Sequence, residues 1–265
     1  MPADNKDKVT ILKLRKQKQN NVKTVGVTAY DYPQALMADN AGVDWILVGD
    51  SLGMTTLGYK STIPVTMDDM LRSARAVARG SSRAFTVGDL PYMSYQVSNE
   101  EAVRNAGDFI QAGMDAVKVE GCMVERVKAI CDAGIMVMSH LGLTPHTRAK
   151  LGGYRVQGKT ADQAKIILDQ ALRLQDAGCT FLLLEGMPRE SAEMIATNLE
   201  IPVLSLGGMR FQKSWDQLDF SEISYEEQNK VENILNLANK YGLSHVETAK
   251  YYSTSEVQLG IGFQN

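Results

Sequence analysis

Short apolar runs alternate with longer amphipathic stretches along most of the chain. The short runs are rich in β-branched side chains and predict eight strands: Lys23–Tyr30, Asp44–Asp50, Arg83–Asp89, Met114–Glu120, Gly134–His140, Cys179–Glu185, Ile201–Gly207 and Ser244–Ala249. The longer stretches place apolar residues at helical spacing and predict helices, as in Thr66–Arg79, Glu100–Ala112, Ala161–Asp176 and Glu226–Lys240. Strands and helices that alternate in this way predict a sheet of parallel strands.

The end of the first strand separates two parallel architectures. An open, doubly wound sheet normally has a glycine-rich phosphate-binding turn after its first strand, and the sequence there, VTAYDYPQA, contains no glycine. A closed (β/α)8 barrel, the TIM barrel, needs no such turn and is typically about 250 residues long. The 265-residue chain, with 44% hydrophobic residues, is therefore predicted to form a single α/β barrel domain over residues 1–265.

Composition narrows the classes of partner and the compartment. The net charge of -3 gives no basis for nucleic-acid binding, and the basic stretch KLRKQK, starting at Lys13, is best explained as a solvated helix face. Three cysteines without CxxC spacing argue against a disulfide framework or a zinc cluster and favour a reducing compartment. No apolar run approaches the roughly 20 residues of a membrane span. We therefore expect a cytoplasmic protein without membrane partners.

Five of the predicted strands stop at a polar residue. These endings are ILVGD at Asp50, FTVGD at Asp89, AVKVE at Glu120, VMSH at His140 and FLLLE at Glu185. Polar residues also end strands merely because they begin turns or cap the next helix. In a parallel barrel, however, the carboxyl ends of the strands meet at one mouth, where active sites lie. The five endings together therefore predict an active site at that mouth.

The carboxylates among these endings indicate a metal site. Asp50, Asp89 and Glu120 would repel one another near a barrel axis unless a cation lay among them, and all-oxygen ligation suits Mg²⁺ better than zinc. A bound Mg²⁺ can chelate the carboxylate and keto oxygens of a 2-oxo acid and stabilise the enolate formed on loss of the adjacent proton. Glu185 is then available as the base.

Two further residues are candidates for substrate binding. Lys118 precedes Glu120 by two positions, so both side chains should point to the same side of the strand, where the ammonium can meet a substrate carboxylate. The alternative for Lys118 is a structural ion pair inside the barrel. His140 precedes the turn-like segment LGLTP, and it either hydrogen-bonds the substrate or satisfies backbone groups below the site.

Longer motifs carry a family resemblance. The segments VTAYDYPQA, ILVGDSLGMTTLGY, STIPVTMDDM, VGDLPYMSYQ, VKVEG, SHLGLTPH, GGYRVQG and LLLEGMP follow one another in an order that resembles ketopantoate hydroxymethyltransferase over residues 1–202. The resemblance implies a (β/α)8 barrel of the phosphoenolpyruvate/pyruvate type. It also implies roles for the strand-end residues: Asp50, Asp89 and Glu120 as the Mg²⁺ site, Asp50, Ser51, Asp89 and Lys118 as contacts to the 2-oxo acid, and Glu185 as the base.

The same resemblance implies a reaction. The acceptor would be 3-methyl-2-oxobutanoate, the one-carbon donor 5,10-methylenetetrahydrofolate and the product 2-dehydropantoate, an intermediate of pantothenate biosynthesis. The partners are thus a small 2-oxo acid and a folate. A homo-oligomer, a decamer in the family, is also implied.

The pattern of the family stops after about Ile201. The family usually continues IPVIGIGAG, whereas this chain has IPVLSLGGMRFQKSWDQLDF. Residues 203–265, with GGMRFQKSW and ANKYGLSHVETAKYY, instead resemble the opening strand-helix-strand of an aldo-keto reductase, another (β/α)8 barrel. Because such units share handedness and strand spacing, this segment is predicted to complete the barrel, with Ser244–Ala249 paired to Ile201–Gly207 and to the first strand.

Two other functions compete with the transferase. A nicotinamide-dependent carbonyl reductase is supported by Glu247 and Tyr252, which resemble an acid and an acidic tyrosine of the reductase active face. A barrel that keeps the fold and the metal site but is catalytically impaired is the other alternative, since fold and function are separable.

Overall fold

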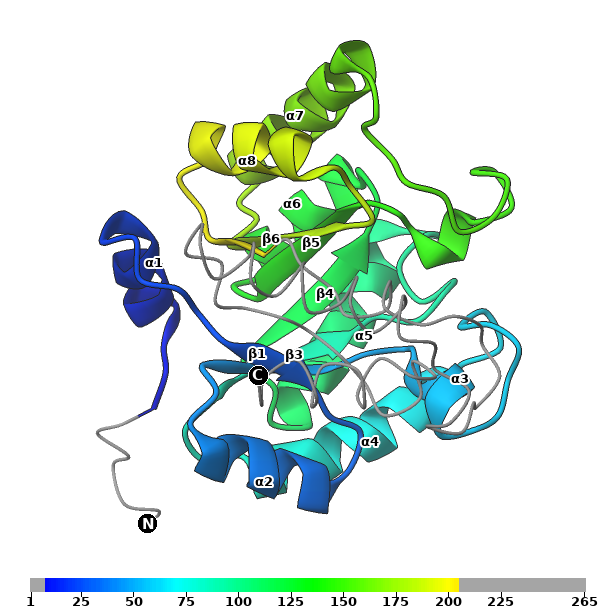
Figure 1. Ribbon diagram of the computed structural model, residues 1–265. Helices are drawn as coiled ribbons and strands as arrows, with labels where there is room; N and C mark the ends of the chain where they lie inside the picture. The colour runs from blue at the N-terminus through cyan, green and yellow to red at the C-terminus, as the bar shows by residue number, and fades with distance from the viewer. Residues whose placement is uncertain (1–7, 205–265) are drawn as a thin grey trace, which may run out of the picture.

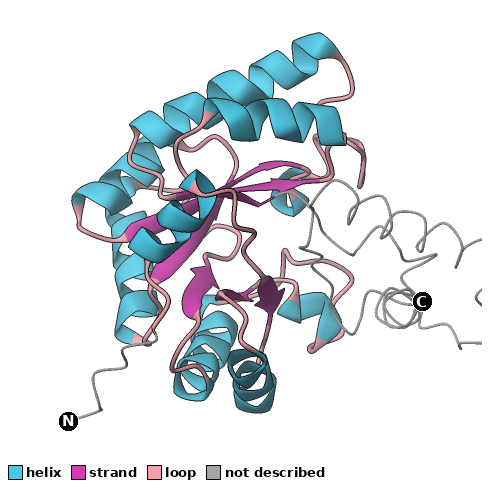
Figure 2. Ribbon diagram, turned by 60° about the vertical axis from the view of Figure 1, so that its left-hand side comes forward, coloured by secondary structure: helices cyan, strands magenta, loops and turns pink. Residues whose placement is uncertain are grey.

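The computed structural model describes residues 8–204, which form one curled sheet of parallel strands surrounded by helices (Figures 1 and 2). Each strand pairs with the next one in the chain, so the spatial order of the sheet, β1 to β7, is the order of the sequence. The strands are β1 (Gly26–Thr28), β2 (Trp45–Val48), β3 (Phe85–Asp89), β4 (Ala116–Glu120), β5 (Met136–Gly142), β6 (Phe181–Glu185) and β7 (Val203–Leu204).

Helices connect the strands, as the alternating pattern predicts. They are α1 (Ile11–Gln19), α2 (Tyr32–Ala41), α3 (Leu52–Thr55), α4 (Met67–Gly80), α5 (Asn99–Gln111), α6 (Val124–Asp132), α7 (Ala161–Asp176) and α8 (Arg189–Asn198), with a short 3-10 helix η1 (Pro145–Thr147). Side chains cap several of them: Thr66 forms a capping box with Asp69 at the start of α4, and the Thr160 hydroxyl accepts a bond from Gln163 N at α7.

The prediction of a parallel α/β sheet is confirmed, and seven of the eight predicted strands occur in the described residues. The observed strands begin one to three residues later than the apolar runs, β1 and β2 also end two residues before the predicted Tyr30 and Asp50, and β5 continues two residues beyond His140 to Gly142. Ser244–Ala249, the predicted eighth strand, and Glu226–Lys240, the predicted helix before it, lie outside the described residues. Closure of the barrel by that strand therefore stays a prediction.

An apolar cluster covers the inner face of the sheet near the N-terminal ends of the strands. It contains Trp45, Leu47, Phe85, Val87, Ala116, Met138, Phe181, Leu183 and Leu204, together with Val9 and Leu14 from the N-terminal segment. Gly26 leaves room for the Trp45 ring, since a Cβ there would lie 1.8 Å from it. The larger cluster, between sheet and helices, includes Val77 of α4, Phe109 of α5 and Ile130 of α6.

Side chains alternate between the two faces of a strand, so every second residue continues the inner face beyond this apolar cluster. Phe85 and Val87 are followed on the same side of β3 by Asp89, and Phe181 and Leu183 are followed in β6 by Glu185. The inner face is therefore apolar where the strands begin and polar where they end.

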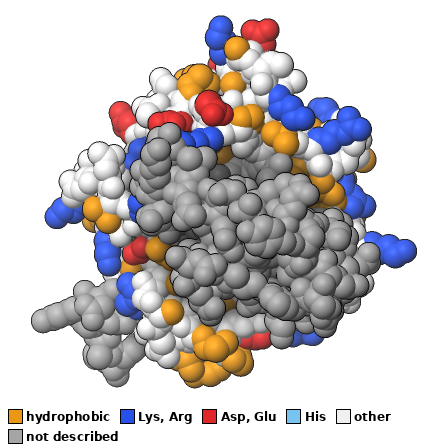
Figure 3. All heavy atoms as spheres, viewed as in Figure 1, with side chains coloured by type: hydrophobic (Ala, Val, Ile, Leu, Met, Phe, Trp, Pro, Cys, Tyr) orange, Lys and Arg blue, Asp and Glu red, His pale blue; other side chains and the backbone are white. Residues whose placement is uncertain are grey.

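The face drawn in Figure 3 is not dominated by one charge. On the face drawn in Figure 3, Lys and Arg side chains lie scattered along the outer edge with Asp and Glu side chains among them. No helix in residues 8–204 is long and apolar enough to cross a membrane.

Candidate active site

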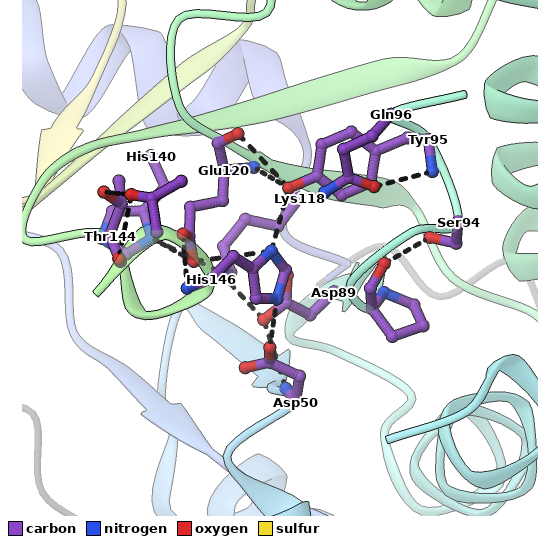
Figure 4. A network of polar contacts seen from close by, with 12 residues as sticks. Asp50, Asp89, Ser94, Tyr95, Gln96, Lys118, Glu120, His140, Thr144 and His146 are labelled. Atoms are coloured by element: carbon purple, nitrogen blue, oxygen red, sulfur yellow. Dashed lines mark hydrogen bonds and ion pairs between the residues drawn. The ribbon is translucent and has the colours of Figure 1, made fainter. Parts of the chain in front are cut away.

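Polar side chains from four neighbouring strands, β2 to β5, meet near the carboxyl ends of those strands (Figure 4). Asp50 follows β2, Asp89 ends β3, Lys118 and Glu120 belong to β4, and His140 lies in β5. All five are less than 10% exposed, which is rare for charged side chains unless they are paired. Glu185 adds a sixth group at the end of β6, and its side chain is 22% exposed.

Direct contacts join these groups into a row that follows the strand order. The backbone N–H of Asp50 donates to Asp89 Oδ2 at 3.2 Å, and Lys118 Nζ lies 2.8 Å from the same oxygen. Lys118 Nζ also lies 3.5 Å from His140 Nδ1, and His140 Nε2 lies 3.3 Å from Glu185 Oε2. The structure thus brings together the residues that the strand endings single out.

Lys118 and Glu120 lie on the same side of β4, as the spacing of two predicts. Lys118 reaches back to Asp89 of β3, whereas the Glu120 carboxylate points toward the loop after β5, where Glu120 Oε1 accepts from the backbone N–H of His146 at 2.8 Å. Ser51, the remaining expected substrate contact, is hydrogen-bonded through Oγ to the Tyr30 hydroxyl at 2.9 Å and so lies at the edge of the row.

Two further residues of the site, His146 and Tyr95, were not predicted from the sequence as functional. His146 Nε2 lies 2.6 Å from Asp50 Oδ2, and its Nδ1 lies 3.1 Å from the Tyr95 hydroxyl. Both residues belong to loops after strands, where no periodic pattern predicts the direction of a side chain. The motif SHLGLTPH does contain His146, but nothing in its spacing relates it to Asp50.

Charge and burial shift the pKa values of the row in opposite directions. Burial and the neighbouring Asp50 outweigh the Lys118 ammonium and raise the pKa of Asp89 to about 7. Burial would also raise the pKa of Asp50, but the hydrogen bond and charge of His146 lower it below its ordinary value. Burial alone would lower the pKa of Lys118, yet Asp89, Asp50 and Glu120 raise it, so this lysine keeps its proton.

Asp50 and Asp89 each have a carboxylate oxygen available to a metal ion. Within residues 8–204, no group of three or more His, Cys, Asp or Glu side chains is arranged to hold a metal. Asp89 Oδ1 is nevertheless buried without a hydrogen-bond partner in this part of the chain, and Asp50 binds His146 through Oδ2 only. Two carboxylates with free oxygens fit Mg²⁺, which commonly binds one or two carboxylates and keeps several waters.

The candidate residues of the alternative reductase function, Glu247 and Tyr252, lie outside the described residues.

Glu185, the candidate base, has a buried oxygen, Oε1, without a hydrogen-bond partner among residues 8–204. An unpartnered carboxylate oxygen at the rim of a charged row is suited to accept a proton.

Comparison with known sequences agrees with this arrangement. The family model described as ketopantoate hydroxymethyltransferase matches residues 8–212. A 3-methyl-2-oxobutanoate hydroxymethyltransferase of Thermoanaerobacter sp. is 51% identical over 204 residues, which cover 76% of this chain and 74% of that protein. One from Ignicoccus hospitalis is 52% identical over 202 residues, covering 76% of this chain and 77% of that protein.

Comparison with solved structures supports the barrel type. A 2,3-dimethylmalate lyase of the PEP mutase/isocitrate lyase superfamily matches with a TM-score of 0.58 and 16% identity, covering 96% of this chain and 84% of that one. A phosphonopyruvate hydrolase in complex with oxalate and Mg²⁺ matches with a TM-score of 0.60 and 11% identity, with the same coverage. At these identities the likeness concerns the fold alone, and it agrees with the predicted phosphoenolpyruvate/pyruvate-type barrel.

Proposed function

We propose a mechanism for this chain from the premise that it belongs to the ketopantoate hydroxymethyltransferase family. The chain is accordingly an enzyme of hydroxymethyl transfer in pantothenate biosynthesis. In the proposed reaction, 3-methyl-2-oxobutanoate accepts a hydroxymethyl group from 5,10-methylenetetrahydrofolate and becomes 2-dehydropantoate.

The observation that carries the proposal is the buried row from Asp50 to Glu185. It contains a protonated lysine next to two carboxylates at one end and an unpartnered carboxylate oxygen at the other. A 2-oxo acid needs these two kinds of group, because its negative carboxylate must be bound while a base removes the proton from the carbon beside the keto group.

Substrate binding is assigned to the Lys118 side of the row. The Lys118 ammonium, which is 5% exposed, would pair with the substrate carboxylate and remain bonded to Asp89, so the substrate is fixed by a short charged contact. Ser51 and His140 would orient the substrate oxygens from either side of Lys118. Glu185 would then take the C3 proton, and its partial exposure leaves a path for that proton to leave.

Asp50 and Asp89 would hold Mg²⁺, with Glu120 completing the protein ligands. When bound, the ion supplies positive charge that stabilises the enolate oxygen and so lowers the barrier to proton removal. The phosphonopyruvate hydrolase, which has a similar fold, was solved in complex with oxalate and Mg²⁺, so this fold is compatible with Mg²⁺ binding. We extend the proposal to a cytoplasmic, homo-oligomeric enzyme, in line with the family.

The first experiment separates proton removal from one-carbon transfer. The protein is incubated with Mg²⁺ and 3-methyl-2-oxobutanoate in deuterated water, and loss of the C3 proton is followed by NMR; folate is then added and 2-dehydropantoate is measured. Both signals are expected. Mg²⁺-dependent exchange without transfer would identify the catalytically impaired barrel, and NADPH-dependent reduction of the substrate would identify the reductase.

The variant Glu185→Gln tests the base. An amide accepts hydrogen bonds but does not take a proton at neutral pH, so exchange should fall by roughly 10²- to 10⁴-fold while binding of the 2-oxo acid persists. The exposed Glu193→Gln substitution in α8 is the control and should leave exchange unchanged. Undiminished exchange in Glu185→Gln would exclude Glu185 from the mechanism.

A further inference from the structure

His146 lies where two loops meet above the charged row. It belongs to the short helix η1 in the loop after β5, and its side chain is 2% exposed. The loop after β3 covers it: the Tyr92 ring meets the imidazole edge-on at 5.6 Å between centroids, and the Tyr95 hydroxyl contacts Nδ1 at 3.1 Å. The imidazole therefore has little freedom to turn.

His146 contacts two of the three carboxylates assigned to the ion. Its ring nitrogen Nε2 lies 2.6 Å from Asp50 Oδ2, and its backbone N–H donates to Glu120 Oε1 at 2.8 Å. One residue of the β5 loop thus constrains carboxylates from β2 and β4. In Figure 4 the imidazole lies between the Asp50 carboxylate and the Tyr95 hydroxyl.

The hydrogen-bond partners determine which ring nitrogen faces Asp50 with a proton. A carboxylate only accepts, so the proton in the bond between His146 and Asp50 is carried by Nε2. The Tyr95 hydroxyl contacts Nδ1 at 3.1 Å and is itself held by the backbone of Glu120, whose N–H donates to it at 3.2 Å and whose carbonyl oxygen accepts from it at 3.3 Å. Tyr95 therefore holds the imidazole in the orientation that donates to Asp50, as carboxylate and carbonyl groups do for histidines around metal sites.

We propose that His146 is a positioning residue that sets the orientation of Asp50 and Glu120 for the metal ion. Its two donors occupy Asp50 Oδ2 and Glu120 Oε1, which leaves Asp50 Oδ1 and Glu120 Oε2 for other ligands. The inference rests on the proposed function, because it takes these carboxylates as metal-binding. It adds a dependence of the metal site on the loops after β3 and β5.

Affinity for Mg²⁺, measured by titration calorimetry with 3-methyl-2-oxobutanoate present, tests the inference apart from turnover. His146→Ala should weaken Mg²⁺ binding by about 10- to 100-fold, the usual effect of removing a group that orients a metal ligand. His146→Gln should recover most of the affinity, since its amide can donate to Asp50 and its backbone N–H is unchanged. Tyr95→Phe should cause a smaller loss of Mg²⁺ affinity, because the His146 ring loses the hydroxyl contact that helps to hold its orientation.

Thr147→Val is the matched control, because Thr147 lies in the same turn and its hydroxyl contacts Thr144 rather than a carboxylate. It should leave Mg²⁺ affinity unchanged, and circular dichroism should show all variants folded. Unchanged affinity in His146→Ala, or equal losses in the alanine and glutamine variants, would overturn the inference. Wild-type protein that binds Mg²⁺ but exchanges no C3 proton would overturn only the proposed reaction, and wild-type protein that binds no Mg²⁺ would overturn both.

Discussion

The two ends of the strands carry opposite chemistry on the same inner face. Near the N-terminal ends, Trp45, Phe85 and Phe181 pack against one another and are at most 2% exposed. Four residues further along β3 and β6, the same face carries Asp89 and Glu185. A shift of a few residues along a strand thus separates a packed hydrocarbon core from a cluster of buried charges.

The comparison indicates how the barrel supports its site. The apolar end gains free energy from burial, about 25 cal/mol per Å² of apolar surface, without needing a ligand. The polar end contains charges whose burial is unfavourable unless they are paired, and its contacts leave Asp89 Oδ1 and Glu185 Oε1 without protein partners in residues 8–204. The first end should therefore stabilise the fold without a ligand, whereas activity and the response of stability to metal should depend on the second.

The largest effect on stability is expected from truncation at the apolar end. Phe181 packs against Phe85, with ring centroids 5.2 Å apart. Phe181→Ala should lower the free energy of unfolding by about 3–5 kcal/mol, because it loses apolar burial and leaves a cavity. Urea denaturation measures this loss. Phe181→Leu, the control, should cost under about 1.5 kcal/mol, and Mg²⁺ affinity of the folded protein should be unchanged in both. A weakened Mg²⁺ affinity would show that the two ends are coupled.

The next effect belongs to the polar end. Lys118→Met removes the cation beside Asp89 and leaves the carboxylates of this row to repel one another, so metal-free protein should lose about 3 kcal/mol of stability. Added Mg²⁺ should restore more stability to this variant than to the wild type, because the ion replaces the missing positive charge. Lys128→Met is the matched control: its pair with Asp132 is 63% and 64% exposed, and its loss should be nearly neutral. A Lys118→Met protein that is insensitive to Mg²⁺ would contradict the assignment of the ion to this end.

The strand endings predicted part of the polar end. Strand endings such as FTVGD and FLLLE place Asp89 and Glu185 by their spacing alone, since a period of two and parallel strands bring them to one mouth. His146 and Tyr95 were missed because loops have no such period. The N-terminal segment was treated only as a solvated helix, which holds for the exposed Lys13 and Lys16 of α1 but not for every residue of it.

Lys18 of α1 is not a solvated residue, because its ammonium contacts a part of the chain that is distant in the sequence. Its ammonium donates to the carbonyl oxygens of Ala196, Leu199 and Ile201 at 3.0, 2.6 and 2.6 Å, which joins α1 to the last turn of α8 and to the segment that leads into β7. Such long-range contacts follow from tertiary packing and not from a local pattern.

Removal of this contact should have a moderate effect on stability alone. Lys18→Met keeps most of the aliphatic stem but leaves three carbonyl oxygens without their shared donor, so unfolding should become easier by about 1–3 kcal/mol. Lys16→Met, on the exposed side of the same helix, is the control and should change stability little. Thermal unfolding measures both variants, and C3-proton exchange in the folded protein should remain at the wild-type rate. Equal stability of the two variants would remove the structural role of Lys18.

The smallest expected effect is a change in the number of protons bound by the carboxylates of the polar end. Because burial and Asp50 raise the pKa of Asp89 to about 7, metal-free folded protein holds a proton there at pH 6 that an unfolded chain would have released. Folding stability without metal should therefore fall as pH rises from about 4 toward 7 through this group.

Mg²⁺ requires the ionised carboxylate, so its binding should release close to one proton at pH 6 and close to none at pH 8.5. Calorimetry in buffers of different ionisation enthalpy measures the number. Asp50 also raises the pKa of His146, so His146 is a second possible source of the released proton. His146→Gln removes this source, and proton release at pH 6 should persist in the variant if the proton comes from Asp89. Equal release at both pH values would show that the ion does not displace a proton from Asp89.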